Sequence, residues 1–461
     1  MKLSIAVLAA AAIALQPTAR RPITLLVVGG TVVTENARHD VLTPGAVAIN
    51  ANEIVDVGTP EAMALKYRSV DTMTVRDQIV LPGLVNTHTH APMVMYRGLA
   101  DDLALMDWLN KYIFPAEAKT VSPEMVRVGT RLAALEMIQS GTTTFADMYY
   151  FEETIARAAR EAGLRGILGE TIIQFPVADA KTPAEGLAHA ERYIREFKDD
   201  PLVTPAVAPH ALYTNDRATL VAAAELGRRF NVPVLIHLAE TEEEVRIARE
   251  QYRTTPVGAL ESLGFFGPRT LAAHAIWVDD ADIAILQKRG VGISHNPESN
   301  MKLASGAAPV TKYLAAGVAL GLGTDGAASN NDLDMFEAIR QASFLAKHAM
   351  HDPTAVSART ALDMATIGGA RALGMESVIG SLEAGKRADL ITVGTGSARF
   401  TPMYDPVSHL VYVARGDDVR NTIVDGKVLM RNRQVKTLDA AAVIAEANRL
   451  AARVREAVSQ K

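Results

Sequence analysis

Strand-like runs alternate with helical segments through the middle of this chain, from about residue 83 to residue 374. Between the strands lie segments with helical periodicity, such as 154–162, 218–230 and 281–289. This alternation predicts parallel βα units, and eight strands in about 290 residues predict a (β/α)₈ barrel. A doubly wound sheet is the alternative, but no glycine-rich dinucleotide-binding motif follows the first strand. The eight predicted strands are Leu84–Asn86, Thr142–Asp147, Gly166–Thr171, Val203–Ala208, Val234–Leu238, Thr270–His274, Val291–Ser294 and Ala319–Gly323.

Short strands also precede and follow this central region. Near the start, a small antiparallel unit is predicted from three runs: 23–28, 46–49 and 53–57. Near the end, further strands are predicted at 389–393, 410–413 and 419–424, with a hairpin turn at Asp425-Gly426.

The predicted fold class is α/β, a TIM-like barrel with a small β-sandwich satellite. We expect the barrel to cover residues 81–376 and the satellite to combine both terminal segments, 22–80 and 377–435. Residues 436–461 are rich in alanine with spaced charges, which predicts a C-terminal helix.

The first residues differ from the rest of the chain. After Lys2, residues 3–15 are almost wholly apolar, but this run is too short to span a bilayer comfortably. It predicts a signal peptide over residues 1–19, and hence a periplasmic or secreted protein. The alternative is an alanine-rich N-terminal helix of a cytoplasmic protein. No other run approaches the roughly 20 apolar residues of a membrane span.

Composition narrows the partners and the chemistry. The chain has no cysteine, so no disulfide can form and a metal site must use nitrogen and oxygen ligands. The net charge of −5 comes without a basic stripe or an arginine-rich arm, which argues against nucleic acid as a partner. We therefore expect a small-molecule substrate, and leave a homo-oligomer open.

Three strand-like runs end in side chains that can bind a metal. His88 and His90 are two residues apart, so on a strand they leave from the same face. His237 ends a second run, and Asp325 follows a third between two glycines. The C-terminal ends of parallel barrel strands meet at one mouth, so these four side chains are predicted to surround one divalent cation. Such a cation lowers the pKa of water from about 15.7 toward about 7, which predicts a hydrolytic enzyme.

Two more residues belong to this predicted mouth. Glu240 follows His237 by three residues and suits proton transfer from water to a leaving amine. Its alternative role is an N-cap or first-turn carboxylate for a helix that starts near 241–244, and the two roles are compatible. His274 ends another strand and is either a ligand or a base that orients water. A lone aspartate such as Asp325 is usually a turn residue, but four histidines at neighbouring strand ends outweigh that reading.

Six of the eleven histidines fall at predicted strand ends, which supports one catalytic layer. These six are His88, His90, His210, His237, His274 and His295. The other five, read as surface or packing residues, are His39, His189, His348, His351 and His409.

Four motifs give the chain a family resemblance. They are Leu81-Pro82-Gly83-Leu84-Val85-Asn86-Thr87-His88-Thr89-His90, His237-Leu238-Ala239-Glu240, Ser294-His295-Asn296-Pro297 and Gly323-Thr324-Asp325-Gly326-Ala327-Ala328-Ser329-Asn330. With them the chain resembles the amidohydrolase superfamily, in the branch of 5′-methylthioadenosine/S-adenosylhomocysteine deaminases and their chlorohydrolase and guanine-deaminase relatives.

The resemblance implies a role for each residue at the mouth. His88, His90, His237 and Asp325 would bind one cation, with Zn²⁺ favoured and iron or manganese left open. Glu240 would contact the substrate ring and protonate the leaving amine, and His274 and Asp325 would share the water's proton. The resemblance also implies three substrate contacts: Glu117 at ribose hydroxyls, His210 at the adenine ring and Trp108 at the pocket wall. The alternatives are core packing for Trp108 and a solvated helix-start carboxylate for Glu117.

One stretch departs from the family pattern. Deaminases of this branch that accept S-adenosylhomocysteine often carry an arginine after the third barrel strand, but residues 168–176 contain none and include Glu170. A neutral nucleoside, such as methylthioadenosine or adenosine, is therefore favoured over S-adenosylhomocysteine. The predicted function is metal-dependent hydrolytic deamination of an aminated purine or purine nucleoside. A hydrolase of another aminated or halogenated heterocycle, resembling guanine deaminase or triazine hydrolase, is the alternative. A non-catalytic metal-bearing binding protein is the third.

Overall fold

The structure is a computed structural model that describes residues 20–267 and 269–459. The predicted signal peptide, residues 1–19, lies outside the described residues. None of the helices in the described part combines the length and apolarity needed to cross a bilayer.

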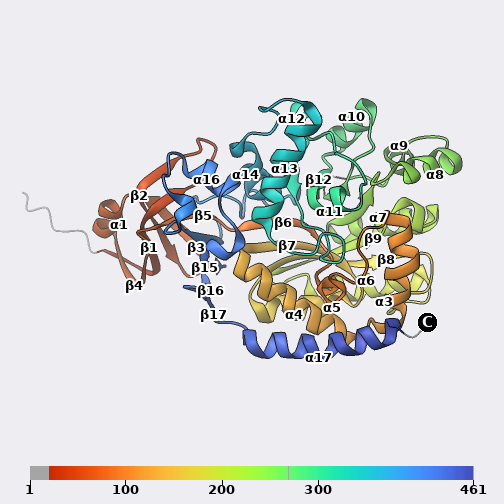
Figure 1. Cartoon of the computed structure of the whole chain (residues 1–461), viewed down its shortest axis with the longest axis horizontal. Coiled ribbons are helices and arrows are strands. Elements are labelled where there is room, and N and C mark those ends of the chain that lie inside the picture. Colours follow the sequence, from red (N-terminus) through yellow and green to blue (C-terminus); the bar gives the residue numbers. More distant parts are fainter. Residues whose placement is uncertain (1–19, 268, 460–461) are drawn as a thin grey trace, which may run out of the picture.

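A closed barrel of eight parallel strands forms the centre of the molecule (Figure 1). All eight predicted strands are confirmed, and with them the predicted barrel. The ring closes where β13 pairs with β6, through Leu322 and Asn86. The strands are β6 (Leu84–Thr89), β7 (Thr142–Tyr149), β8 (Arg165–Ile172), β9 (Val203–Pro209), β10 (Val234–Leu238), β11 (Thr270–His274), β12 (Gly292–His295) and β13 (Leu320–Leu322).

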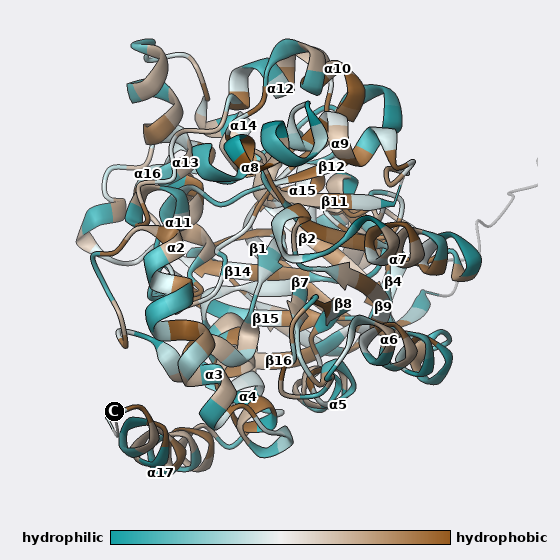
Figure 2. Cartoon of the chain, turned by 90° about the vertical axis from the view of Figure 1, so that its right-hand side faces the viewer, coloured by the Kyte–Doolittle hydropathy of each residue, from teal (hydrophilic) through white to brown (hydrophobic). Residues whose placement is uncertain are grey.

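Helices surround the barrel, and Figure 2 shows both hydrophilic and hydrophobic residues on them. Many begin with a polar side chain that accepts the N–H of a residue in the first turn, as Ser122 does at α4 (Pro123–Ser140). The predicted helical segments correspond to α5 (Glu152–Ala162), α7 (Arg217–Phe230) and α10 (Asp280–Arg289). The other helices of the barrel region include α6 (Pro183–Phe197), α8 (Glu242–Tyr252), α9 (Pro256–Ser262), α11 (Pro297–Lys302), α12 (Val310–Ala316), α13 (Met335–Met350), α14 (Ala358–Ala365) and α15 (Ile367–Ala372).

Both terminal segments contribute strands to one nine-stranded sheet beside the barrel. Its order is β17-β16-β15-β14-β5-β1-β2-β3, and β4 pairs with β1. The early strands are β1 (Arg21–Val33), β2 (Val41–Asn50), β3 (Glu53–Gly58), β4 (Tyr67–Thr74) and β5 (Gln78–Pro82). The late strands are β14 (Leu390–Gly394), β15 (Val419–Val424), β16 (Lys427–Arg431) and β17 (Gln434–Val435).

The three early strands that the sequence predicts pair antiparallel as expected, but two further strands make the early unit mixed. Helix α1 (Pro60–Lys66) lies between β3 and β4, and β4 then pairs in parallel with β1. Strand β5 also pairs in parallel with β1. Two parallel strands need a connection that crosses over between them, and α1 is part of this connection. The sequence pattern did not predict this short helix.

The predicted strand at 410–413 was also wrong, because this segment lies in and just after helix α16 (Pro406–Tyr412). Asp405 caps the helix by accepting the N–H of Val407, and Pro406 occupies the first turn. Val407, Leu410 and Val411 are buried at a helical spacing of three and four residues. The apolar residues at 410–413 suggested a strand, but the N-cap and the helical spacing of the buried residues are those of a helix.

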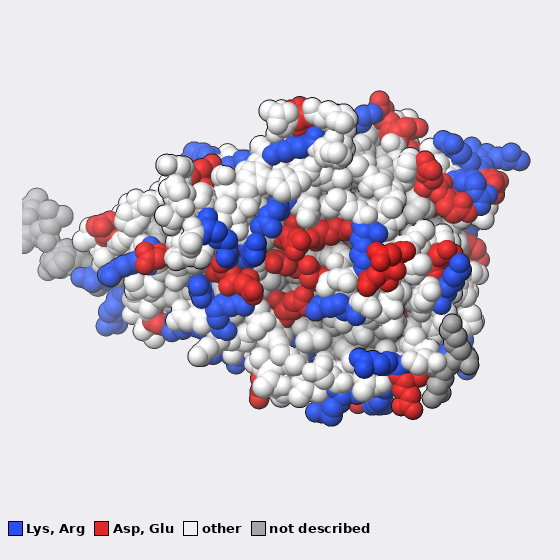
Figure 3. All heavy atoms as spheres, in the orientation of Figure 1, with Lys and Arg blue, Asp and Glu red and all other residues white. Residues whose placement is uncertain are grey.

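The predicted C-terminal helix is confirmed as α17 (Ala440–Ser459), which lies along α4 (Figure 1). Its buried side chains are Val443, Ala447, Leu450 and Val454, which share one face. On the face of the molecule drawn in Figure 3, acidic and basic side chains are interspersed, with an acidic group near the middle.

A single residue, Gly83, joins the sheet to the barrel between β5 and β6. A Cβ at this position would collide with the side chain of Thr143 on β7, so only glycine allows the close approach. The Gly83 N–H donates to the Asp389 carbonyl just before β14. The strand that carries His88 and His90 therefore starts from a fixed point on the sheet.

Candidate metal centre and pocket

The four predicted metal ligands converge at the C-terminal mouth of the barrel. His88 lies near the end of β6 and His90 directly after it. Asp325 Oδ1 lies 3.4 Å from His88 Nε2 and 3.4 Å from His90 Nε2. His237, from β10, places its Nε2 atom 3.3 Å from His90 Nε2. Residues far apart in sequence thus form one cluster of ligand atoms, as their strand-end positions predicted.

Backbone carbonyls set the proton positions on two of these rings. The Met148 carbonyl accepts from His90 Nδ1 at 2.7 Å, and the His210 carbonyl accepts from His237 Nδ1 at 2.8 Å. A carbonyl oxygen can only accept, so each Nδ1 carries a proton, and the tautomer that this leaves presents a lone pair at Nε2. These two lone pairs face each other with no proton between them, an arrangement that a bound cation stabilises.

The protonation states also suit a metal. His88 Nε2 is buried without a hydrogen-bond partner among the described residues. Burial lowers the pKa of His88 to about 4 and the pKa of His237 well below its ordinary value, so both rings are neutral near pH 7. Burial alone would raise the pKa of Asp325, but contact with His88 holds it well below 3.8. Neutral imidazoles and an ionised carboxylate are the forms that bind a divalent cation.

Asp325 is held in place by its surroundings. Its φ of 66° is in the left-handed region, which costs a non-glycine residue roughly 1–3 kcal/mol. The hydroxyl of Ser299 donates to Oδ2 at 2.6 Å, and the N–H of Gly326 donates to Oδ1 at 2.7 Å. A Cβ at Gly323 would collide with the side chain of Asn296, so glycine allows the backbone before Asp325 to lie close to this side chain. The carboxylate is therefore oriented toward the histidines before any ligand binds.

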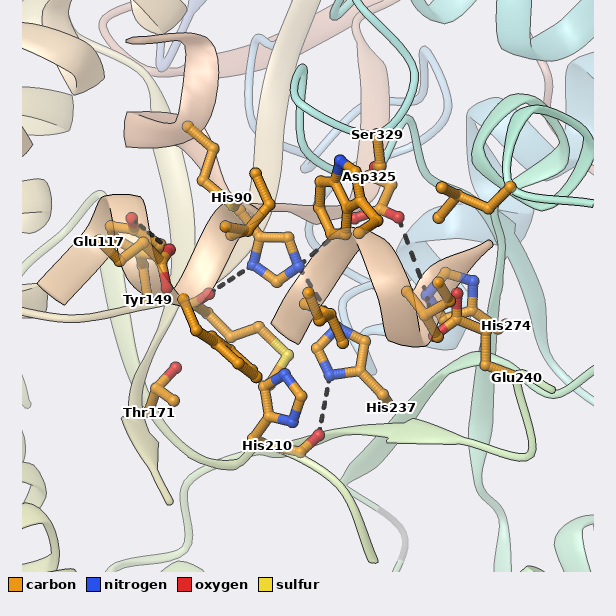
Figure 4. A pocket seen from close by; sticks show the side chains of 18 of the residues that line it. His90, Glu117, Tyr149, Thr171, His210, His237, Glu240, His274, Asp325 and Ser329 are labelled. Carbon is orange, nitrogen blue, oxygen red and sulfur yellow. Dashed lines mark hydrogen bonds and ion pairs between the residues drawn. The ribbon is translucent and has the colours of Figure 1, made fainter. Parts of the chain in front are cut away.

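Glu240 and His274 lie on one side of this cluster (Figure 4). His274 Nε2 is 3.8 Å from Glu240 Oε2 and 3.9 Å from Asp325 Oδ2. His274 Nδ1 is 2.9 Å from the Asn300 amide oxygen, which accepts its proton. Burial raises the pKa of Glu240. Burial alone would lower the pKa of His274, but the carboxylate of Glu240 reverses this and raises it.

Glu240 is not the residue that caps the following helix. The side chain of Thr241 caps α8 by accepting the N–H of Glu244, while Glu240 donates its own N–H to the Glu244 carboxylate at 3.0 Å. The Glu240 carboxylate is thus free of capping and is nearly fully buried beside the cluster.

The remaining predicted site residues line the same pocket. Glu117 accepts the Tyr149 hydroxyl at 2.7 Å, and burial raises the pKa of Glu117 to about 7. Figure 4 shows this pair on the opposite side of the pocket from Glu240 and His274. Glu117 is buried, which contradicts the solvated alternative. Trp108 is buried and lines the pocket, with its Nε1 unpartnered among the described residues.

His210 also lines the pocket, with its ring 4.7 Å from that of His237. The Thr214 hydroxyl lies 3.1 Å from His210 Nδ1 and itself donates to the Ala211 carbonyl, so it accepts from the ring. His210 Nε2 is therefore left without a proton. Burial lowers the pKa of His210 to about 3, which keeps this ring neutral.

Two strand-end residues from the sequence stand apart from the pocket. His295 is buried, but it does not line the pocket and neither ring nitrogen has a partner in the described part of the chain. Glu170 also does not line the pocket, whereas its neighbour Thr171 does. Successive side chains on a strand point to opposite faces, so Thr171 faces the pocket and Glu170 faces away from it.

The sequence reasoning missed several residues that complete the site. Ser299 and Asn300, which hold Asp325 and His274, lie two and three residues after the Ser294–Pro297 motif, so their position was a usable signal. Tyr149 ends β7 and could have been found by the same strand-end rule. Apart from Trp108, the apolar residues of the wall from Leu105 to Phe114 belong to no motif and had no such signal.

A parallel barrel with three histidines and an aspartate at its strand ends defines a TIM-barrel hydrolase. The chain belongs to the amidohydrolase family, whose model matches residues 79–429. The resemblance read from the motifs is therefore confirmed.

Individual relatives extend over nearly the whole chain. A protein of Syntrophus aciditrophicus named 5-methylthioadenosine/S-adenosylhomocysteine deaminase 1 is 45% identical over 94% of this chain and 98% of its own. A 5′-deoxyadenosine deaminase of Methanosarcina acetivorans is 48% identical over 81% and 85%. The crystal structure of an adenosine deaminase from Xanthomonas campestris with bound zinc has a TM-score of 0.93 and 40% identity, covering 95% and 100% of the two chains.

Proposed function

We propose that this protein is a metal-dependent hydrolytic deaminase of an adenine nucleoside, which releases ammonia. The observation that carries the proposal is the layout of one pocket. Four ligand-type side chains and two proton-transfer groups lie at one end, and a buried carboxylate that can bind hydroxyls lies at the other. The names of three relatives, all deaminases of adenine nucleosides, support this reading.

His88, His90, His237 and Asp325 would hold the cation. When bound, it supplies Lewis acidity and lowers the pKa of water toward about 7. Two imidazoles with fixed Nε2 lone pairs favour zinc, and the zinc in the Xanthomonas campestris relative supports that choice. Iron and manganese remain alternatives, because both accept nitrogen and oxygen ligands.

The protein's own groups move the protons. In the reaction, water adds to the ring carbon that bears the amine, and the bond from this carbon to nitrogen breaks as ammonia leaves. His274 Nε2 lies within 4 Å of both Glu240 and Asp325, so a water among them contacts all three. Glu240, whose pKa is raised by burial, would deliver one proton of the water to the ring nitrogen. Asp325 and His274 would accept the water's other proton, which returns through Glu240 to the amine as it departs as ammonia.

The opposite end of the pocket would bind the sugar. The Glu117 carboxylate can accept ribose hydroxyls, and the Tyr149 hydroxyl holds it in place. Trp108 and Phe114 supply apolar surface for the base, and His210 contacts the adenine ring.

We further propose that the 5′ group of the substrate carries no charge. No lysine or arginine is among the described residues that line the pocket, and the nearby acid, Glu117, would repel a carboxylate. The homocysteine tail of S-adenosylhomocysteine would therefore lack a cationic partner. Methylthioadenosine, 5′-deoxyadenosine and adenosine fit this pocket better.

A substrate panel tests the function. Zinc-loaded enzyme is incubated with adenosine, methylthioadenosine, 5′-deoxyadenosine, S-adenosylhomocysteine, guanine and a chlorinated triazine, and released ammonia is measured. We expect turnover of the three neutral nucleosides and a much lower kcat/KM for S-adenosylhomocysteine. Turnover of the triazine or of guanine without the nucleosides would contradict the proposal.

A periplasmic or secreted location rests only on the apolar start of the sequence, and we retain it as a proposal. N-terminal sequencing of the mature protein would test it. Cleavage within or just after residues 1–19 supports export, and an intact Met1 contradicts it.

A further inference from the structure

A second cluster of ligand-type side chains lies outside the pocket, where strand β8 meets helices α5 and α6. It consists of Glu170 on β8, Asp179 in the loop after β8, and His189 on α6. One ligand atom of each lies within 4.8 Å of those of the other two. Glu170 faces away from the pocket, so this cluster is separate from the catalytic end.

Both carboxylates are anchored to the start of α5, and each uses only one oxygen for this. The N–H of Glu152 donates to Glu170 Oε2 at 3.0 Å, and the N–H of Phe151 donates to Asp179 Oδ2 at 2.6 Å. The second oxygens, Glu170 Oε1 and Asp179 Oδ1, are buried and accept no N–H or O–H group of the described residues. Burial and the neighbouring Asp179 raise the pKa of Glu170 well above its ordinary value, as expected for two carboxylates held close together without a cation.

Further unpartnered groups surround this spot. Glu152 is fully buried, and neither of its carboxylate oxygens has a hydrogen-bond partner in the described chain. The Tyr193 hydroxyl, one turn after His189 on α6, is also buried and unpartnered. Burial raises the pKa of Glu152 far above its ordinary value, and the charges of Asp147 and Glu170 add to this shift. Several acids therefore share one low-dielectric region.

Among the described residues, no ion pair involves Asp147, Glu152, Glu170 or Asp179. Arg160 on α5 and Arg165 on β8 pair instead with Asp200 and Asp389. Buried carboxylates are costly unless they are protonated, paired or bound to a cation. One imidazole with carboxylate oxygens is a ligand set that suits Mn²⁺ or Zn²⁺.

We propose that Glu170, Asp179 and His189 bind a second divalent cation of the manganese type, separate from the catalytic metal. The ion would join β8, the start of α5 and α6. Its role is to hold these elements together behind the barrel wall, and it does not contact substrate.

Metal counting tests the proposal with Mn²⁺ as the probe. The full-length protein is stripped with a chelator, reloaded with Mn²⁺ and desalted, and bound metal is measured by mass spectrometry and electron paramagnetic resonance. We expect two equivalents in the wild type, one in His189→Ala and one in His237→Ala. His348→Ala, an exposed histidine on α13, is the matched control and should keep two.

His189 is only half-buried, so its removal should leave the fold intact, which circular dichroism checks. The His189→Ala variant should also lose the rise in melting temperature that Mn²⁺ gives the wild type beyond that from the first site. A wild type that binds one equivalent, unchanged in His189→Ala, would overturn the proposal. It would mean that a proton shared between Glu170 and Asp179 neutralises this cluster.

Discussion

Glu240 Oε2 lies 3.8 Å from His274 Nε2, and both groups are buried on the same side of the histidine cluster. The acid and the base of the proposed reaction are thus close enough to act on one water. His274 itself has a φ of 70°, a left-handed conformation that is rare outside glycine. Strain of this kind, in a buried residue aimed at a cluster of ligands, is typical of functional sites.

Removing a ligand and removing the proton carrier should have different effects. We expect His237→Ala to lose the metal, because Nε2 of this ring is one of the converging lone pairs. We expect Glu240→Gln to keep the metal and to lose roughly 10²–10⁴-fold in kcat. Metal content and ammonia release distinguish the two. If both variants keep metal and rate, the assigned roles are wrong.

The hydroxyl of Ser299 should support metal binding without touching the metal. It donates to Asp325 Oδ2 at 2.6 Å, and such outer partners typically contribute about 10–100-fold in metal affinity. Ser299→Ala should therefore weaken zinc binding by this factor in a competition with a fluorescent chelator. Ser262→Ala is the control, because the Ser262 hydroxyl donates to the Ala259 carbonyl on α9 and to no other group of the described residues. Equal zinc affinity in both variants would refute the role of Ser299.

A substitution at Glu117 should show whether this carboxylate binds the ribose of the substrate. If its carboxylate accepts ribose hydroxyls, Glu117→Gln should lower kcat/KM for adenosine by about 10–100-fold, the effect of weakening charged hydrogen bonds. The same change should matter far less for 2′,3′-dideoxyadenosine, which lacks those hydroxyls. An equal loss for both nucleosides would indicate a structural role through Tyr149 instead.

Glu35 should make stability depend on pH. Burial, aided by Asp363, raises the pKa of Glu35 from 4.5 to about 8, despite the opposing charge of Arg359. The folded state then holds this proton more tightly than the unfolded chain does. Its contribution is fully present below about pH 4.5 and is lost as the pH rises through 8.

Glu35→Gln should remove this dependence. Relative to the wild type, the variant should gain stability on the order of 2–5 kcal/mol between pH 5 and pH 9. Urea unfolding at the two pH values measures the difference, with Glu61→Gln on the exposed face of α1 as control. A Glu35→Gln variant that follows the wild type at both pH values would show that Arg359 keeps this carboxylate ionised.

The site residues that lie at strand ends could be predicted from the sequence, but the contacts made by backbone carbonyls could not. His88, His90, His237, His274 and Asp325 were found because parallel strands place their last residues at one mouth. The Met148 and His210 carbonyls that set the ring protons could not be found, because every residue has a carbonyl. The partners of Glu170 were likewise hidden, since they depend on how α5 and α6 pack.

Errors in the fold had local causes. The segment at 410–413 has strand-like composition, but Asp405 and Pro406 start a helix there. The mixed pairing of the early sheet depends on the seven-residue helix α1, which is too short to give a clear period. Long, regular features, such as the eight βα units and α17, were predicted correctly.

Because Gly83 alone joins β5 to β6, a change in the terminal sheet can displace the strand that carries His88 and His90. Strand β5 is paired with β14, and the Arg165 guanidinium clamps Asp389, next to β14, at 2.8 Å. A break in the backbone near β14 would therefore be transmitted through β5 to β6, the strand that presents His88 and His90. Cleavage of the chain near residue 390 is therefore expected to weaken metal binding, although no residue there is one of the four proposed ligands.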